Sequence, residues 1–127
     1  YAVQVVKHDY KTKIKKKYFG NKNEDYPRKN WSSVILWNCA HEKHKILTPN
    51  FIQNQTGAFL HRFNWLDDEE IGRLSHEWNW LAGWYQEPMD GEPKAIHYTE
   101  GGPWFKNYRH CEYGDIWKNY LAEMMKR

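Results

Sequence analysis

The chain lacks the features that mark several protein classes. Its two cysteines, Cys39 and Cys111, show no CxxC spacing, so the sequence does not suggest a disulfide-dense secreted fold. No apolar run approaches the roughly 18–20 residues that cross a membrane, and no signal peptide is visible. A P-loop, a GxGxxG motif and a Ser-His-Asp set are also absent. We therefore expect a cytoplasmic protein with free thiols, although the sequence leaves a single Cys39–Cys111 bridge open.

Aromatic residues are plentiful. The 127 residues include eight Trp, nine Tyr and five Phe, enough rings either to fill the core of one domain over 1–127 or to contact flat ligands such as sugars. The net charge is only +3, and the basic excess is concentrated in "KHDYKTKIKKKYFGNK". That run is typical of a solvated loop or of a phosphate-binding patch. Because the net charge is small and "DDEE" is acidic, we do not expect nucleic acid as a partner.

Strands and helices are expected to alternate, which favours an α/β fold. Apolar runs predict strands at 2–8, 31–39, 71–75 and 94–99, of which 31–39 reads as a core strand. Short helices are predicted at 41–47, 48–57 and 58–63, an acidic helix start or turn at 67–70, and a last helix at 115–127. Residues 10–30 and 87–93 are expected to be surface segments.

Two of the predicted helices, 48–57 and 115–127, are bounded by residues that are typical of helix ends. Thr48 is expected as an N-cap with Pro49 at the first helical position, and Gly57 lies past the expected end of that helix. Asp115 is expected to cap the last helix, whose residues Ile116, Tyr120 and Met124 share one face.

His97 ends the short apolar run within the predicted strand 94–99, and Gly101, Gly102 and Pro103 turn the chain after it. The carboxyl edge of a sheet is where α/β proteins bind ligands, and a neutral imidazole can ligate Mn²⁺ or Zn²⁺. The glycines leave room for an anion to approach backbone N–H groups. The alternative reading is a hydrogen-bonded structural histidine before a tight turn.

The stretch "EWNWLAGWYQ" concentrates large rings. Trp78, Trp80 and Trp84 beside Asn79 resemble a sugar-binding platform, whereas core packing would explain one or two of the rings. His41 and His44 in "HEKHK", and the carboxylates of 67–70, are better explained as exposed charge than as metal sites.

Three stretches occur in an order that resembles a known family. "WSSVILWN", then "RLSHEWNWL", then "AIHYTEGGPWFK" are similar to motifs of the family 8 retaining glycosyltransferases, the group of glycogenin and bacterial lipopolysaccharide galactosyltransferases, and most of all to a marine bacterial and phage branch. The similarity covers roughly residues 30–106.

The resemblance implies the C-terminal portion of a GT-A fold, a Rossmann-like three-layer arrangement around a mixed sheet. It implies transfer of a sugar from a nucleotide-sugar, such as a UDP-sugar, with Mn²⁺ or Mg²⁺ as cofactor. By the same resemblance His97 would ligate the metal, Gly101 and Gly102 would admit the diphosphate, and Trp104 would close the site. Lys106 would replace the family's phosphate-binding lysine, because Gly102 stands in that lysine's place.

The acceptor side follows from the same comparison. Asn79, Trp78 and Trp80 would bind substrate, and His61 would stand in for a catalytic polar group. The family's DxD motif and its first nucleotide-binding strands are missing from the sequence, so we expect the chain to be a fragment that is inactive alone and associates through an exposed sheet edge. The acceptor is expected to be a glycan or lipid-linked sugar. The alternative function is a non-catalytic carbohydrate-binding module with exposed Trp rings.

Overall fold

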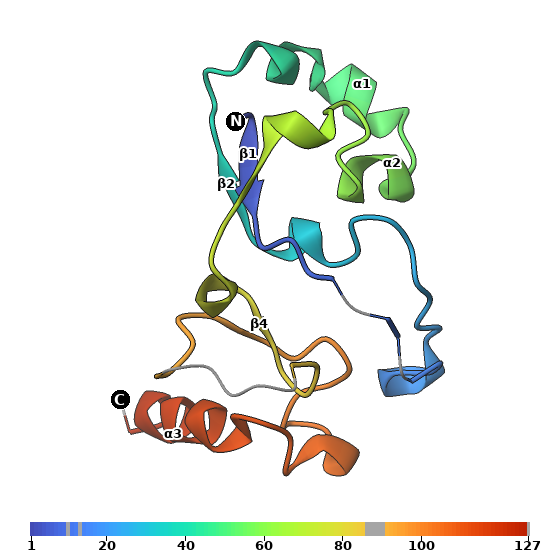
Figure 1. The fold of residues 1–127 in the computed structure, drawn as a ribbon. Helices are drawn as coiled ribbons and strands as arrows, with labels where there is room; N and C mark the ends of the chain where they lie inside the picture. The colour runs from blue at the N-terminus through green and yellow to red at the C-terminus, as the bar shows by residue number, and fades with distance from the viewer. Residues whose placement is uncertain (10, 13, 86–90, 127) are drawn as a thin grey trace.

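The structure of the chain is a computed structural model, and it describes residues 1–9, 11–12, 14–85 and 91–126. The segment 86–90, where most of the expected loop 87–93 falls, lies outside the described residues, as do 10, 13 and 127. The fold is mixed α/β with two small sheets (Figure 1). The α/β prediction is therefore confirmed at this level.

The first sheet consists of β1 (Val3–Val5), β2 (Ile35–Trp37) and β3 (Ile71–Arg73) in the order β2-β1-β3. β1 pairs antiparallel with β2 and parallel with β3, so this sheet is mixed as expected. The second sheet is a parallel pair, β4 (Trp80–Leu81) and β5 (Ile96–His97).

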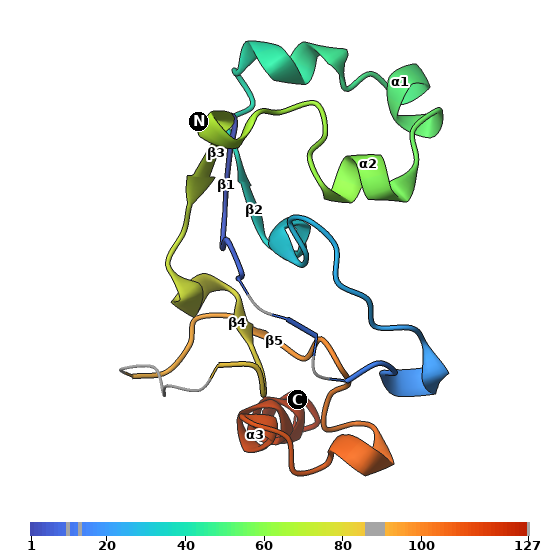
Figure 2. The ribbon, with the colours of Figure 1, turned by 45° about the vertical axis from the view of Figure 1, so that its right-hand side comes forward.

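The described residues also form three α-helices and six 3₁₀ turns. The α-helices are α1 (Pro49–Gln53), α2 (Gly57–His61) and α3 (Gly114–Met124). The 3₁₀ turns are η1 (Tyr18–Gly20), η2 (Trp31–Ser33), η3 (Glu42–Ile46), η4 (Asp68–Glu70), η5 (His76–Trp78) and η6 (Lys106–Tyr108). α1 and α2 lie beside the first sheet, whereas α3 lies beyond the second sheet at the other end of the molecule (Figure 2).

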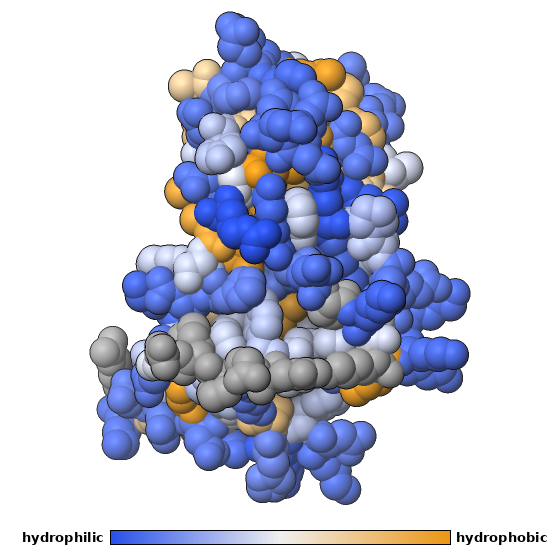
Figure 3. All heavy atoms as spheres, viewed as in Figure 1, coloured by the Kyte–Doolittle hydropathy of each residue, from blue (hydrophilic) through white to orange (hydrophobic). Residues whose placement is uncertain are grey.

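The main core lies where the first sheet meets the segment after α2. Its buried members are Ala2, Val3, Val5, Phe63, Leu66 and Ile71. Residues of β1 alternate between this core and the opposite face, so Val3 and Val5 are buried while Gln4 is not. The face of the molecule shown in Figure 3 is mostly hydrophilic with small, separate apolar patches. Among the described helices, none combines the length and the apolar character that a membrane span requires.

The strand 31–39 differs from expectation. Its first residues form η2, and β2 occupies only Ile35–Trp37 at the edge of the sheet. Leu36 is 55% exposed, because it projects from the sheet face opposite the core cluster. A β-branched run predicts a strand but not its place in the sheet, and the expectation of a core strand is wrong here.

The predicted cap at Thr48 is confirmed, whereas the predictions for Gly57 and Asp115 need correction. The Oγ1 of Thr48 accepts a hydrogen bond from the Phe51 N–H, as its N-cap position predicts. Gly57 lies past the end of α1, as expected, but it does not cap that helix and instead begins α2, whose N-cap is Thr56. α3 is capped at Tyr113, so Asp115 lies in the first turn instead.

The predicted apolar face of the last helix is not a buried one. Ile116 is partly buried, but Tyr120 and Met124 are exposed. A spacing of four residues aligns side chains on one helix face without saying what covers that face.

Candidate functional site

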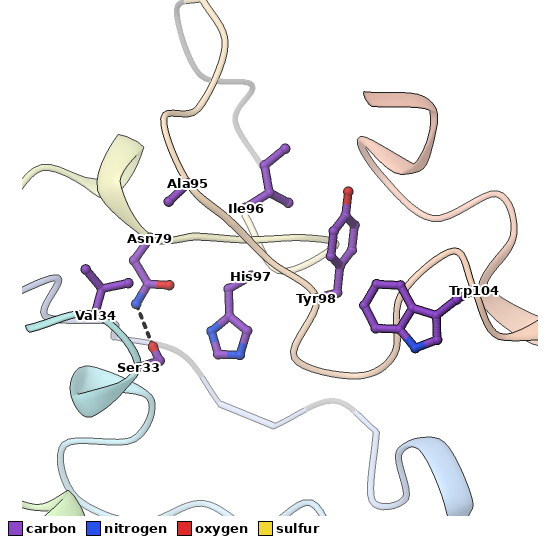
Figure 4. A pocket seen from close by; sticks show the side chains of 8 residues that line it. All are labelled: Ser33, Val34, Asn79, Ala95, Ile96, His97, Tyr98 and Trp104. Carbon is purple, nitrogen blue, oxygen red and sulfur yellow. Dashed lines mark hydrogen bonds between the residues drawn. The ribbon is translucent and has the colours of Figure 1, made fainter. Parts of the chain in front are cut away.

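A pocket of about 360 Å³ lies at the carboxyl end of β5. Four separate stretches of the chain line it: Ser33, Val34, Asn79, Ala95, Ile96, His97, Tyr98 and Trp104. Figure 4 shows the His97 ring between Ser33 and Tyr98, with Trp104 beyond Tyr98. The structure thus brings together three residues that the sequence singled out separately, namely Asn79, His97 and Trp104.

The pairing of β4 with β5 places Asn79 and His97 on the same pocket. Asn79 precedes β4, and His97 is the last residue of β5, opposite Leu81. Ladder hydrogen bonds from Trp80 N to Ala95 O and from Ala82 N to His97 O fix this register.

The surroundings of His97 favour its uncharged form. Burial lowers its pKa below the ordinary value, and the positive charge of Lys17 lowers it further. Its Nδ1 is buried and has no hydrogen-bond partner among the described residues. A neutral imidazole with an unused ring nitrogen in a pocket wall can ligate a metal ion or hydrogen-bond a ligand.

Asn79 provides a second unpaired polar atom. Its side chain is buried, with 1% of the residue exposed, and its Nδ2 donates to Ser33 Oγ at 2.7 Å. Its Oδ1 has no partner among the described residues, and Figure 4 shows this oxygen on the side of His97. Unpaired buried polar atoms are rare because each costs about 1–3 kcal/mol. Two of them in one wall favour a polar ligand.

His8 and Tyr85 form a polar cluster with Asn79 that was not predicted from the sequence. His8 is buried, its Nε2 is 3.0 Å from Asn79 Nδ2, and its Nδ1 is 2.5 Å from Tyr85 Oη. Burial, then the charges of His76 and His97, lower the pKa of His8 to about 3. Burial also raises the pKa of Tyr85 to about 12. The signal for His8 was available, since it ends a predicted strand.

The two glycines after β5 have a packing role. A Cβ on Gly101 would lie 2.7 Å from the Tyr108 ring, and one on Gly102 would lie 2.0 Å from the Trp104 ring. Gly101 also has φ +152, a conformation that side chains disfavour. Both glycines are buried. In this conformation the two rings fill the space beside the glycines, and the expected role of the glycines in admitting a phosphate stays a prediction.

The expected aromatic platform is not formed. Trp80 and Trp84 are buried, and Trp80 Nε1 donates to Glu112 Oε1 at 3.3 Å. Trp78 is 45% exposed, with Lys94 Nζ 4.8 Å from its ring centroid. Core packing thus explains two of the three rings, and none of the three lines the pocket.

His61 and Lys106 are exposed and lie outside the pocket lining. His61, the last residue of α2, contacts Ser32 Oγ through Nδ1 at 2.9 Å. Their expected roles in catalysis and phosphate binding stay predictions.

The cysteines and the other possible metal-binding side chains do not form a cluster among the described residues. Cys39 and Cys111 are both free thiols. Within the described ranges no group of three His, Cys, Asp or Glu side chains is placed to hold a metal ion.

The chain is similar to a plant protein. It is 49% identical to Protein CDI of Arabidopsis thaliana over 129 aligned residues, which cover 99% of this chain and 50% of that protein. The chain thus spans about half the length of the curated relative it matches. No protein-family model and no solved structure matches the chain.

Proposed function

We propose that this chain is the acceptor-side part of a metal-dependent glycosyltransferase, where it closes the site around the metal and diphosphate of a nucleotide-sugar. The observation that carries the proposal is the unpartnered, buried Nδ1 of His97 in a pocket at the end of β5. The three ordered motifs between residues 30 and 106 support it. A GT-A arrangement, a UDP-sugar donor and a cytoplasmic location belong to the same proposal.

In this proposal the pocket supplies one ligand to a transition metal, the imidazole of His97. Imidazole is a good ligand for Mn²⁺, and the lowered pKa of His97 keeps the ring unprotonated near neutral pH. The described residues hold no group of three His, Cys, Asp or Glu side chains placed to bind a metal, so in this proposal other groups would complete the coordination of the ion. Oxygen ligands such as water and the diphosphate of the donor would meet this need. When bound, Mn²⁺ would neutralise charge on the leaving nucleoside diphosphate.

In this proposal Asn79 binds the sugar and Trp104 shields the pocket from water. The free Oδ1 of Asn79 would accept a hydrogen bond from a sugar hydroxyl, while its Nδ2 stays bonded to Ser33. The Trp104 ring is 51% exposed and packs 5.4 Å from Trp117, so it can cover the pocket mouth and exclude water.

The test measures the release of UDP when the protein is incubated with each of a panel of UDP-sugars and MnCl₂. We expect Mn²⁺-dependent release of UDP that His97→Ala reduces by at least 100-fold, since catalytic metal sites lose 10–100-fold even for outer changes. His110→Ala, an exposed histidine outside the pocket, is the matched control. Equal, chelator-insensitive rates in wild type and His97→Ala would overturn the proposal.

A carbohydrate-binding module is the second candidate, favoured by the partly exposed rings of Trp78 and Trp104. It predicts glycan binding that EDTA does not change. Loss of that binding in Trp104→Ala together with intact binding in His97→Ala would favour the module over the transferase.

A further inference from the structure

Residues 15–23 of the Lys-rich segment form a short hairpin. The Asn23 N–H donates to Lys15 O at 2.9 Å, next to an isolated antiparallel β-bridge between Lys16 and Lys22. The 3₁₀ turn η1 closes the hairpin at its tip. A run that composition describes as a solvated loop therefore has a defined backbone.

The hairpin is fixed to the rest of the protein. The Tyr18 N–H donates to Glu100 O at 3.1 Å, and the Tyr18 ring stacks on Phe105 with centroids 5.5 Å apart. On the other side, the buried Lys29 Nζ donates to Asn23 Oδ1 at 2.7 Å. Figures 1 and 2 both show η1 at the outer edge of the molecule. The tip is thus held in place and presented to the surroundings.

The tip exposes an apolar ring. Phe19 is 84% exposed, more than any other large hydrophobic residue that the structure describes. Its φ of +56 lies in the left-handed region, which bulky residues adopt rarely, and its ring meets Phe105 edge-on with centroids 5.2 Å apart. A single exposed ring is common on protein surfaces, so its neighbours decide what it can bind.

Lysines flank the exposed ring on both strands of the hairpin. The sequence from residue 11 to residue 22 contains six lysines and no acidic residue. Lys15 and Lys16 are exposed, and neither forms a salt bridge with any described residue. Lys22 is the one whose charge is balanced, by Glu24 at 2.9 Å. The surface around the ring is therefore positively charged.

We propose that the hairpin 15–23 docks the protein on an anionic membrane surface. Phe19 enters the boundary between headgroups and acyl chains, while Lys15 and Lys16 bind lipid phosphate groups. A cluster of about four to eight basic residues is typical of segments that bind anionic lipids, and six lysines lie in this run. Neither the hairpin nor its lipid partner depends on the proposed function.

A nucleic acid is the less favoured partner for the same lysines. Its affinity comes from many phosphate contacts along a track, whereas these lysines are confined to one short hairpin. A lipid interface uses both features of the tip, because it attracts the ammonium groups and also removes the Phe19 ring from water.

The test is sedimentation of the protein with two kinds of vesicle, phosphatidylcholine alone and phosphatidylcholine with phosphatidylserine in a ratio of about two to one. We expect binding to the mixed vesicles that weakens as the salt concentration rises. Lys15→Gln combined with Lys16→Gln should weaken this binding about 25-fold, since each lysine near the surface contributes about fivefold. Phe19→Asn should weaken it about 10-fold, and asparagine tolerates the left-handed backbone at this position.

Two control variants make matched changes away from the hairpin. Lys43→Gln combined with Lys45→Gln removes two exposed lysines from η3, which lies far from η1 in Figures 1 and 2. Met125→Asn changes an apolar side chain that is 77% exposed. Both controls should keep the vesicle affinity of the wild type, because charges beyond about 10 Å from the membrane are screened by salt.

Equal losses of vesicle affinity in the hairpin variants and their controls would overturn the proposal, as would equal binding of the wild type to both kinds of vesicle. A loss in Met125→Asn alone would place the docking surface at the end of α3 and reject the hairpin. Tighter binding of a duplex oligonucleotide than of mixed vesicles, lost in the double lysine variant of the hairpin, would make nucleic acid the partner instead. Absence of vesicle binding by the wild type rejects the proposal and leaves the proposed function standing.

Discussion

The Nδ2 of Asn79 lies 3.0 Å from the Nε2 of His8, a contact between residues 71 positions apart. Because an amide nitrogen only donates, Nε2 is the acceptor, and the single proton of the neutral ring belongs to Nδ1. Nδ1 then donates to Tyr85 Oη at 2.5 Å. The wall of the pocket is therefore tied to a buried, uncharged histidine.

The stability of the protein should depend on the charge state of His8. The pKa of His8, about 3 in the folded protein, lies below the ordinary histidine value of 6.5, so unfolding takes up a proton between these pH values. This contribution is complete above about pH 6.5 and is lost as the pH falls toward 3, at about 1.4 kcal/mol per pH unit. His8→Gln should remove this part of the pH dependence of the free energy of unfolding. Denaturant unfolding from pH 7 to pH 4 measures it, and parallel curves for both proteins would count against a neutral, buried His8.

Asn79→Ala should lower the free energy of unfolding by about 1–3 kcal/mol, because Ser33 and His8 lose a buried partner. Asn107→Ala changes an exposed asparagine and should stay within about 0.5 kcal/mol of wild type. Urea denaturation compares the two. Similar small effects in both variants would mean that the hydrogen bonds of Asn79 contribute little to the free energy of unfolding.

Gly102→Ala should displace the Trp104 ring, since the new methyl would lie 2.0 Å from it. Overpacking of this kind costs about 1–3 kcal/mol. Gly57→Ala is the control, because its Cβ would meet only His61, at 3.9 Å, on a helix. Near-ultraviolet circular dichroism and thermal unfolding should report a change in the first variant alone. An unaltered tryptophan signal in Gly102→Ala would contradict the packing role of this glycine.

Arg28→Lys should destabilise the loop after α2 by about 2 kcal/mol, since a lysine cannot replace a guanidinium that bonds several carbonyls. Arg28 donates to the backbone oxygens of Arg62, Phe63 and Leu66. Arg109→Lys, an exposed site, should leave unfolding unchanged. Chemical denaturation tests both, and equal stability of the two variants would show that these bonds are dispensable.

Local signals predicted much of the fold. The Thr48 cap, the acidic turn of η4 and the strands β1, β3 and β5 follow from residue type and spacing. The position of β2 at the sheet edge does not, because strand order depends on contacts between segments far apart in the sequence. For the same reason the burial of Trp80 and the exposure of Tyr120 were not predictable from spacing.

The site was predicted residue by residue but not as an arrangement. His97, Asn79 and Trp104 were each singled out, and the structure adds that they share a pocket with Ser33. The contact of His8 with Asn79 behind this pocket could not be predicted from sequence, since it joins residues 71 positions apart.

The most direct test of the account is paramagnetic broadening of nuclear magnetic resonance signals when Mn²⁺ and UDP are added to the encoded protein. We expect selective loss of signals from His97, Ser33 and Tyr98, and we expect His97→Ala to abolish that loss. Signals around α1 should persist. Uniform or absent broadening at His97 would contradict a metal–nucleotide site in this pocket.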